Sequence, residues 1–266
     1  MAKTNDRTTQ QQQPSPSLKW DILTLLAVLL LLLCADLFVP PHVRPVDLKD
    51  PAYNYPHIPD IVPTPTVILV AFFAPIVILF VTQLSRLRQV KYLCALYVLA
   101  LFESNVITIL LTSVFKSVAG RPRPYFSSVC ESYAENVENL CTGHPSAVRE
   151  ARKSFPSGHS SLVFSAATFT FLYLVHGLRL GEASTSAGLA KMIVALLPLV
   201  GAGLIAVSRT IDYHHHFSDI VAGTALGAFI ASFVFWCRRT SITKAMEFEQ
   251  GDGNEYIAVT SDEGSV

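Results

Sequence analysis

Charged side chains are scarce in this sequence of 266 residues. Lys, Arg, Asp and Glu make up 15% of the chain and hydrophobic residues 51%, whereas about a quarter of an average soluble domain is charged. The composition therefore argues against a soluble protein and for one that crosses a membrane several times. The 20 basic and 20 acidic residues cancel, so the excess positive charge typical of nucleic-acid binding is missing and no nucleic acid is expected as a partner.

A secretory signal peptide and Asn-x-Ser/Thr glycosylation acceptors are also missing. The first 17 residues are polar, and the first apolar run begins only at Trp20, which favours an uncleaved membrane anchor. The length suits one helical domain. We predict a disordered cytosolic tail over residues 1–19, one domain over 20–238, and an acidic, disordered cytosolic tail over 239–266.

Six apolar runs reach the roughly 20 residues that a helix needs to cross the hydrocarbon core of a bilayer. They predict an all-α, six-helix transmembrane bundle. Residues 40–65 are rich in proline and should not form a long helix. Gly223, Gly227 and Ala231 recur every four residues, so their face should pack closely against a neighbour and would permit a homo-oligomer. The predicted spans are 20–39, 66–84, 92–115, 160–178, 189–207 and 219–236.

Helix parity places segments 116–158 and 208–218 on the same side of the membrane. The turn at 85–91 has three basic residues and no acid, so the positive-inside rule places that turn and both termini in the cytosol. The two segments then face the lumen or the exterior. An oxidising compartment would permit a disulfide between Cys130 and Cys141, both in the longer segment, although two free thiols are the alternative.

Two polar segments lie at this outer face, each next to an apolar run. Lys116 is followed seven residues later by Arg123-Pro124, and two cations at this spacing can approach one anion. Pro156-Ser157-Gly158-His159 precedes the fourth predicted span, where free backbone amides of a helix N-terminus can cradle phosphate. Each segment also has a simpler interpretation, interfacial cations in the first and a serine helix cap in the second.

The third polar segment contains Ser208-Arg209, His215 and Asp219. If the sixth helix includes them, His215 and Asp219 share one face, and Asp219 can fix the imidazole so that its other nitrogen is a nucleophile. The neighbouring histidines at 214 and 216 would then point about 100° away. A metal site formed by the three histidines and Asp212 is the alternative. Adjacent histidines on a helix diverge and the spacing of zinc hydrolases is absent, so neither a metal nor another cofactor is expected.

Together the three segments resemble the motifs of the type 2 phosphatidic acid phosphatase superfamily, the lipid phosphate phosphatases. The resemblance extends from about residue 50 to residue 236, and residues 141–161 resemble the branch active on diacylglycerol pyrophosphate and phosphatidate. It implies that Lys116, Arg123, Ser157, Gly158 and Arg209 bind the phosphate. It also implies that His215 attacks phosphorus to form a phosphohistidine, that His159 protonates the leaving group, and that Asp219 orients His215. The cations would then replace the metal of most phosphoryl-transfer sites.

We therefore expect an integral multi-pass enzyme of an endomembrane or the plasma membrane, with its active site lumenal or extracellular. Its substrates would be lipid phosphate monoesters or diphosphates such as phosphatidate, lysophosphatidate and diacylglycerol pyrophosphate. The alternatives are an isoprenoid diphosphate or sphingoid-base phosphate phosphatase, and a catalytically silent lipid-binding membrane protein. Among the remaining polar residues, we expect Glu103 and Asn105 to form a hydrogen-bonded pair within the bundle, and Arg152 and Lys153 to form a solvated surface.

Overall fold

The computed structural model describes residues 18–83, 91–131, 141–177 and 188–262, and for residues 18–19, 32–33, 35–38, 83, 91–94 and 242–262 it describes the backbone alone. Within these ranges the chain is all-helical. The predicted N-terminal tail lies outside the described residues as far as residue 17. The long helices are α1 (Leu18–Phe38), α2 (Thr64–Gln83), α3 (Lys91–Ala119), α6 (Gly158–Gly177), α7 (Gly188–Ile211) and α8 (Phe217–Asp262), and the short ones are η1 (Pro51–Tyr53), α4 (Phe126–Cys130) and α5 (Pro145–Ala151).

Five helices in the described part of the chain are long and apolar enough to cross a membrane. They lie in α2, α3, α6, α7 and α8, which confirms five of the six predicted spans and makes the protein a multi-pass membrane protein. The first predicted span coincides with α1, but its described side chains form only the shorter apolar stretch Trp20–Leu31. This span stays a prediction. The absence of a long helix between residues 40 and 63 is confirmed.

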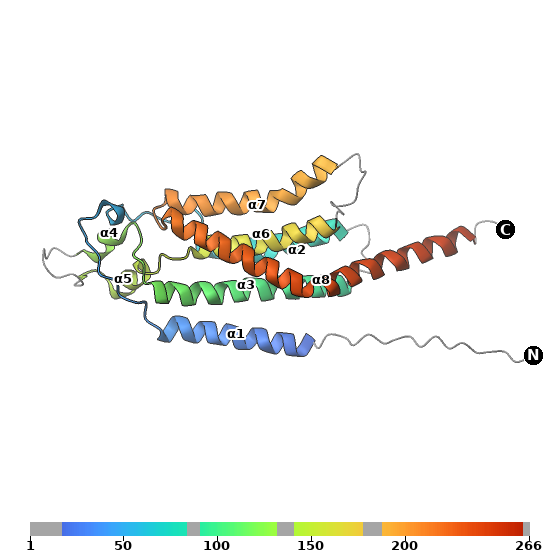
Figure 1. Ribbon diagram of the computed structural model, residues 1–266, viewed down its shortest axis with the longest axis horizontal. Coiled ribbons are helices and arrows are strands. Elements are labelled where there is room, and N and C mark those ends of the chain that lie inside the picture. Colours follow the sequence, from blue (N-terminus) through green and yellow to red (C-terminus); the bar gives the residue numbers. More distant parts are fainter. Residues whose placement is uncertain (1–17, 84–90, 132–140, 178–187, 263–266) are drawn as a thin grey trace, which may run out of the picture.

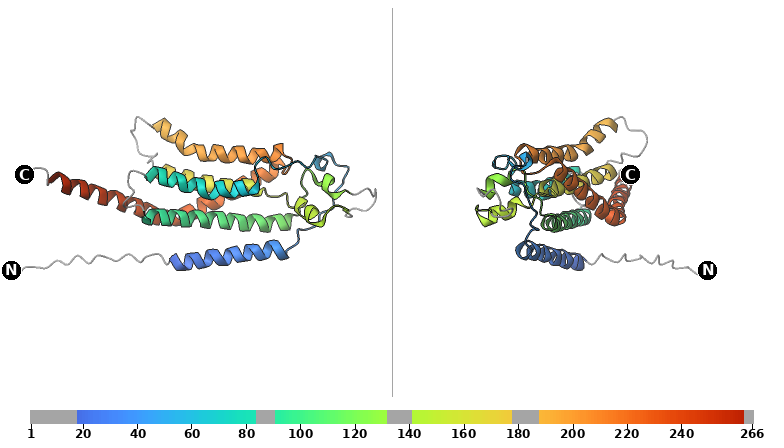
Figure 2. Two further views of the ribbon diagram at one scale, coloured as in Figure 1. Left: turned by 180° about the vertical axis from the view of Figure 1, so that it is seen from behind. Right: turned by 60° about the vertical axis from the view of Figure 1, so that its left-hand side comes forward.

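The long helices form a bundle whose two ends differ (Figure 1). The first residues of α1 and the last residues of α8 lie at one end, whereas α4, α5 and the segment before α2 lie at the other (Figure 2). Helix α6 is central and contacts α2, α3, α7 and α8, while α1 packs against α3. The end that carries α4 and α5 therefore gathers all three polar segments.

The small-residue face of α8 packs against α6. A Cβ atom at Gly223 would lie 2.5 Å from the carbonyl oxygen of Ser157, and one at Gly227 would lie 2.0 Å from that of Ser161. Ala231 is also fully buried. The predicted close packing is confirmed, but the neighbour belongs to the same chain. This face is therefore covered within the chain and is not free to contact a second copy. A homo-oligomer stays a prediction, but it no longer rests on this face.

Glu103 and Asn105 of α3 do not pair with each other. Arg238 of α8 donates to Glu103 and lies 3.1 Å from Asp21 of α1, whereas the Asn105 amide donates to the carbonyl oxygen of Ala71 at 3.1 Å. The predicted pair is wrong because residues two positions apart point to different sides of a helix. The Arg238 contacts instead connect α1, α3 and α8.

Helix α8 continues past the end of the candidate span at Ser241 and reaches Asp262. This differs from the disordered tail expected from residue 239. Residues 240–250 lack proline and glycine and contain Ala, Lys, Met, Glu and Gln, which are strong helix formers. Their propensity favours continuation of the helix beyond the span.

The segment between α3 and α6 is packed and partly helical. Gly120, with φ of 53°, ends α3, and the left-handed conformation suits glycine at a helix C-terminus. Tyr125, Phe126, Cys130 and Ala151 then form a small buried cluster. The disulfide between Cys130 and Cys141 is present, with Cα atoms 4.5 Å apart, and confirms the predicted bridge.

Arg152 and Lys153 are buried, with 5% and 7% exposure, so the prediction of a solvated surface is wrong. The Arg152 guanidinium lies 4.6 Å from the centroid of the Phe126 ring and donates to the carbonyl oxygen of Arg44 at 2.9 Å. The segment between α3 and α6 folds back and covers these side chains because the small cluster draws α4 and α5 together.

Candidate active site

A cavity of about 640 Å³ lies at the end of the bundle that carries α4 and α5. One part is lined by cations, histidines and carboxylates, and the other by apolar residues of α2, α3 and α6, which include Val67, Ile68, Ile109 and Leu162. Six of the eight predicted site residues line it, namely Lys116, Arg123, Gly158, His159, Arg209 and His215, whereas Ser157 and Asp219 do not. The structure therefore brings the three motifs to one cavity.

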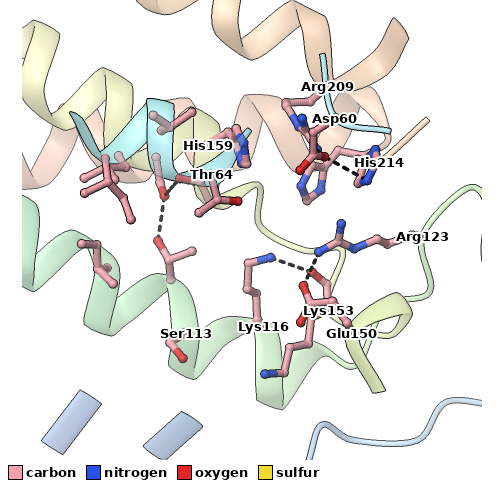
Figure 3. A pocket seen from close by; sticks show the side chains of 18 of the residues that line it. Asp60, Thr64, Ser113, Lys116, Arg123, Glu150, Lys153, His159, Arg209 and His214 are labelled. Atoms are coloured by element: carbon pink, nitrogen blue, oxygen red, sulfur yellow. Dashed lines mark hydrogen bonds and ion pairs between the residues drawn. The ribbon is translucent and has the colours of Figure 1, made fainter. Parts of the chain in front are cut away.

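Lys116 and Arg123 form one wall of the cavity (Figure 3). Lys116 lies in the last turn of α3 and donates to the carbonyl oxygen of Lys153 at 2.7 Å. Nη2 of Arg123 contacts Oε1 of Glu150 at 2.5 Å. Nε of Arg123 is buried without a hydrogen-bond partner among the described residues. A buried donor of this kind is costly unless a ligand oxygen accepts from it.

The second motif begins α6. Ser157 is fully buried, and its Oγ accepts from the backbone N of Ser160 at 3.4 Å and from Oγ of Ser160 at 3.0 Å. Its hydroxyl thus caps the helix, as the simpler interpretation of this segment expected, and does not face the cavity. A Cβ atom on Gly158 would lie 3.5 Å from Cε of Lys116. His159, one residue further, lines the cavity, and its Nε2 donates to the carbonyl oxygen of Val62 at 3.0 Å.

Arg209 is held between two carboxylates on the opposite wall (Figure 3). Nη2 lies 2.7 Å from Asp60, and Nη1 lies 2.7 Å from Asp212. Nε2 and Nδ1 of His214 approach the same two acids at 3.0 and 3.2 Å. Burial acts to raise the pKa of both acids, but the hydrogen bonds and charges of Arg209 and His214 lower each pKa below its usual range. Both acids are therefore carboxylates, and Nε of Arg209 has no partner among the described residues.

His215 is neutral and has a defined tautomer. Its Nδ1 lies 2.8 Å from the carbonyl oxygen of Ser154. A carbonyl oxygen can only accept, so Nδ1 carries the proton and Nε2 has the lone pair. Burial lowers the pKa of His215 well below 6.5, and the charge of Arg123 lowers it further, although Asp219 opposes this shift. The result is a neutral imidazole with a nucleophilic nitrogen.

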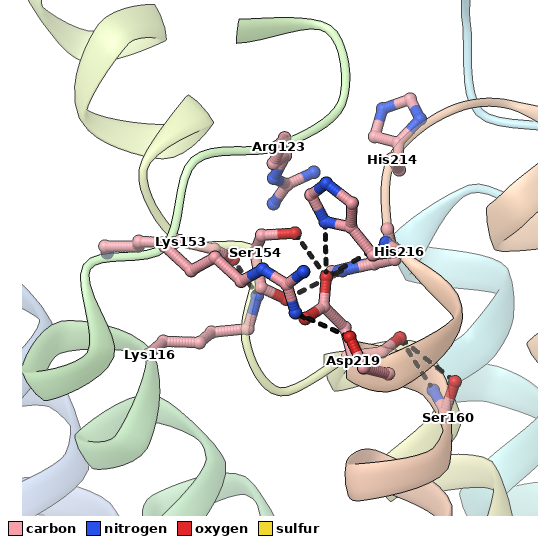
Figure 4. A network of polar contacts seen from close by, with 12 residues as sticks. Lys116, Arg123, Lys153, Ser154, Ser160, His214, His216 and Asp219 are labelled. Carbon is pink, nitrogen blue, oxygen red and sulfur yellow. Dashed lines mark hydrogen bonds and ion pairs between the residues drawn. The ribbon is translucent and has the colours of Figure 1, made fainter. Parts of the chain in front are cut away.

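Asp219 lies at the centre of a buried network (Figure 4). Its Oδ1 accepts from Nη1 of Arg121 at 2.6 Å. Its Oδ2 accepts from Oγ of Ser154 at 2.6 Å and from the backbone N and Nδ1 of His216 at 3.0 and 3.2 Å. Nδ1 of His215 is 3.8 Å from this carboxylate, which is longer than a hydrogen bond. Asp219 therefore reaches His215 through Ser154, whose hydroxyl contacts the acid and whose carbonyl contacts the imidazole.

This indirect contact differs from the direct bond expected from the spacing of His215 and Asp219. Helix α8 starts only at Phe217, and the preceding turn includes Tyr213 with φ of 58°. Because His215 is outside the helix, the i,i+4 rule does not apply to it. The prediction that the three histidines diverge holds for another reason, since the turn directs His214 to Asp212, His215 to Ser154 and His216 to Asp219.

Among the described residues, one group could hold a metal ion, formed by Asp60, Asp212 and His214. It differs from the sequence candidate, which used all three histidines and omitted Asp60. The guanidinium of Arg209 already contacts both carboxylates at 2.7 Å. A bound divalent ion would have to displace or repel this cation, so the residues do not fit a metal.

Several residues of the site were not predicted from the sequence, and two of them, His57 and Asp60, come from the covering segment, residues 53–62. Its Tyr55 ring stacks on Tyr213 with centroids 4.6 Å apart, and its His57 ring lies 4.3 Å from that of Tyr125. Partial burial, together with the charges of His214 and Arg123, lowers the pKa of His57. The segment has no motif, and its proline content predicted only that it is not a long helix.

The family of the chain follows from comparison with known proteins. The sequence profile of the PAP2 superfamily matches residues 92–243, which contain all three motifs. The chain belongs to the PAP2 superfamily. Membership confirms the resemblance that the three motifs indicated and makes the protein a homologue of the lipid phosphate phosphatases.

Individual relatives support this placement. A PA-phosphatase related-family protein of Dictyostelium discoideum is 36% identical over 71% of this chain and 65% of its own length. Lipid phosphate phosphatase 2 of Arabidopsis thaliana is 38% identical over 52% of this chain and 49% of its own length. This chain thus covers less than two thirds of either relative. Probable diacylglycerol pyrophosphate phosphatase 1 of Schizosaccharomyces pombe is 30% identical over 81% of this chain and 79% of its own length. No solved structure matches the chain significantly.

Proposed function

We propose that this PAP2 protein is a lipid phosphate phosphatase that works through a phosphohistidine and without a metal. The observation that carries the proposal is the cavity, which joins a cationic, histidine-lined part to an apolar part between membrane helices. Ile68 lines the apolar part and is 46% exposed on the outside of the bundle. A phosphorylated lipid can then place its headgroup among the cations while its acyl chains remain in the bilayer.

The phosphate would accept hydrogen bonds from donors that have no partner in the described part of the protein. The buried Nε atoms of Arg123 and Arg209 lack hydrogen-bond partners among the described residues. Lys116 adds a cation on the wall of Arg123, and the backbone of Gly158 lines the cavity beside it. Charge-assisted hydrogen bonds from these groups stabilise the negative charge that phosphoryl transfer spreads over the equatorial oxygens.

His215 and His159 have separate roles in the proposed reaction. Nε2 of His215 attacks phosphorus while the bond from phosphorus to the leaving oxygen breaks, and His159 gives a proton to that oxygen. A water molecule then attacks the phosphohistidine, the bond between phosphorus and nitrogen breaks, and His159 accepts a proton from the water. Ser157 contributes indirectly by capping the helix that positions His159. Asp219 acts as a positioning residue through Ser154.

The disulfide, together with the positions of the start of α1 and the end of α8, supports an orientation. Cys130 and Cys141 lie at the same end as the cavity, and disulfides persist in oxidising compartments. We infer that the active site faces the lumen or the exterior of an endomembrane or the plasma membrane, with both termini in the cytosol. The positive charges of the turn at 85–91 favour the same orientation.

Phosphate release from micellar phosphatidate, lysophosphatidate and diacylglycerol pyrophosphate in the presence of EDTA tests this function. Turnover should persist in EDTA, and activity that disappears and returns with magnesium would exclude the metal-free mechanism. A silent lipid-binding protein would release no more phosphate than its His215→Ala variant. Isoprenoid diphosphates and sphingoid-base phosphates in parallel assays test the alternative substrates.

A further inference from the structure

Asp60 places a negative charge on the wall of the cavity that carries His159. It belongs to the covering segment, which precedes the part of the chain matched by the PAP2 profile. Two residues later, the carbonyl oxygen of Val62 accepts from Nε2 of His159 at 3.0 Å and lies 3.4 Å from Nη1 of Arg209. Figure 3 shows Asp60, Arg209 and His159 on one side of the cavity and Lys116 and Arg123 on the other.

Arg209 and His214 on the Asp60 wall direct most of their nitrogen atoms at carboxylates. Nη2 and Nη1 of Arg209 contact Asp60 and Asp212, each at 2.7 Å. Both ring nitrogens of His214 are directed at the same two carboxylates. Of the Arg209 nitrogens, Nε is the one without a partner among the described residues. One arginine thus faces two carboxylates, and this wall has no surplus positive charge from these groups.

In the proposed mechanism the leaving group departs toward this wall. In-line transfer places the attacking nitrogen and the leaving oxygen on opposite sides of phosphorus, so a leaving group that His159 protonates lies on the side of His159 and Asp60. A phosphate monoester loses a neutral alcohol there. With a diphosphate the leaving group is itself a phosphate monoester, which would approach the Asp60 carboxylate while the Nη atoms of Arg209 and the ring nitrogens of His214 are already engaged. His57 also lines the cavity, but its lowered pKa leaves it neutral near pH 7.

We propose that Asp60 is a specificity-determining residue that makes this site prefer phosphate monoesters over diphosphates. The inference rests on the proposed phosphatase function and deepens it. The relatives leave the choice open, because their names include both a lipid phosphate phosphatase and a probable diacylglycerol pyrophosphate phosphatase.

The test compares kcat/KM for phosphatidate with kcat/KM for diacylglycerol pyrophosphate in the full-length protein. Asp60→Asn keeps an acceptor for Arg209 and removes the negative charge. It should raise the ratio of diphosphate to monoester activity by about tenfold, the effect of removing one like charge beside the leaving group. Asp60→Glu keeps the charge and should keep the wild-type ratio.

Glu150→Gln is the matched control, because Glu150 also lines the cavity but pairs with Arg123 on the other wall. It should leave the ratio close to that of the wild type. An unchanged ratio in Asp60→Asn would overturn the proposal, and an equal rise in Glu150→Gln would show that net charge matters rather than the position of Asp60.

A measurement on the wild-type enzyme decides the case even if Asp60→Asn does not fold. Inorganic pyrophosphate should inhibit phosphatidate hydrolysis no more strongly than inorganic phosphate does, and a much tighter inhibition by pyrophosphate would refute the role of Asp60. If the wild type releases no phosphate beyond the His215→Ala background, the phosphatase function itself fails. If phosphatidate is hydrolysed but the selectivity is absent, only the role of Asp60 fails.

Discussion

Nδ1 of His215 donates to the backbone carbonyl oxygen of Ser154 at 2.8 Å, and the hydroxyl of the same serine donates to Asp219 at 2.6 Å. One residue therefore contacts both the proposed nucleophile and the buried acid. The carbonyl fixes the tautomer, and the hydroxyl ties the position of that carbonyl to the start of α8. This arrangement assigns separate roles to the backbone and the side chain of Ser154, so they can be tested separately.

Ser154→Ala should lower kcat by about tenfold, because it removes a buried hydrogen bond to a charged group and keeps the carbonyl that orients His215. The KM for phosphatidate should change little, since Ser154 does not line the cavity. Steady-state kinetics in detergent micelles measure both constants. Ser154→Thr restores a hydroxyl and should recover part of the activity. Ser146→Ala on the exposed side of α5 is the control, and an equal loss there would contradict the prediction.

His215→Asn should reduce turnover about 1,000-fold or more, since it removes the nucleophile. The amide nitrogen of asparagine can still donate to the Ser154 carbonyl, so the fold should persist. Phosphate release from phosphatidate measures the effect. A variant that retains near wild-type turnover would exclude His215 as the nucleophile. Asp219→Asn should be less damaging than His215→Asn, because it disturbs the position of the imidazole and leaves the imidazole in place.

The same His215→Asn variant should also weaken the dependence of stability on pH. Folded His215 binds a proton only well below pH 6.5, whereas the unfolded residue binds one near that pH. The unfolded state therefore takes up more protons as the pH falls through 6.5, and the free energy of unfolding decreases. Asparagine does not titrate, while His57 is present in both proteins.

Thermal unfolding in detergent at about pH 7.5 and about pH 5.5 tests this linkage, since the lower pH protonates an ordinary histidine and the higher does not. The decrease in Tm should be smaller in the variant than in the wild type. Equal decreases would mean that the imidazole of His215 is not held neutral in the folded protein.

The motifs and most of the fold could be predicted because their signals are local. Long apolar runs predicted five confirmed spans, and Cys130 and Cys141 fell in one segment between two predicted spans and form a bridge. The contacts of Asp60 and Ser154 could not be predicted. Asp60 lies 149 residues from Arg209 in the sequence, and Ser154 lies 65 residues from Asp219. Neither pairing has a periodic pattern, because irregular backbone positions both residues.

Close packing of α8 on α6 predicts opposite effects for two glycine substitutions. Gly227→Ala should destabilise the protein by about 1–3 kcal/mol, the usual cost of overpacking, because its Cβ would lie 2.0 Å from a carbonyl oxygen. Gly203→Ala in α7 meets nothing within 4 Å and should stabilise by roughly 0.5–1 kcal/mol, as alanine does in a helix. Thermal unfolding of the purified proteins measures both effects. Equal Tm values for the two variants would contradict the packing of α6 against α8.

The orientation predicts which engineered cysteines an impermeant maleimide reaches in sealed vesicles with their cytosolic face outward. In a background without Cys34, Cys94 and Cys237, Lys244→Cys follows the candidate span that ends at Ser241 and should react at once. Ser146→Cys, exposed on α5 beside the cavity, should react only after detergent opens the vesicles. The parent without free cysteines controls for reaction at the disulfide. The reverse pattern would place the active site in the cytosol, where Cys130 and Cys141 would have to remain bridged in a reducing environment.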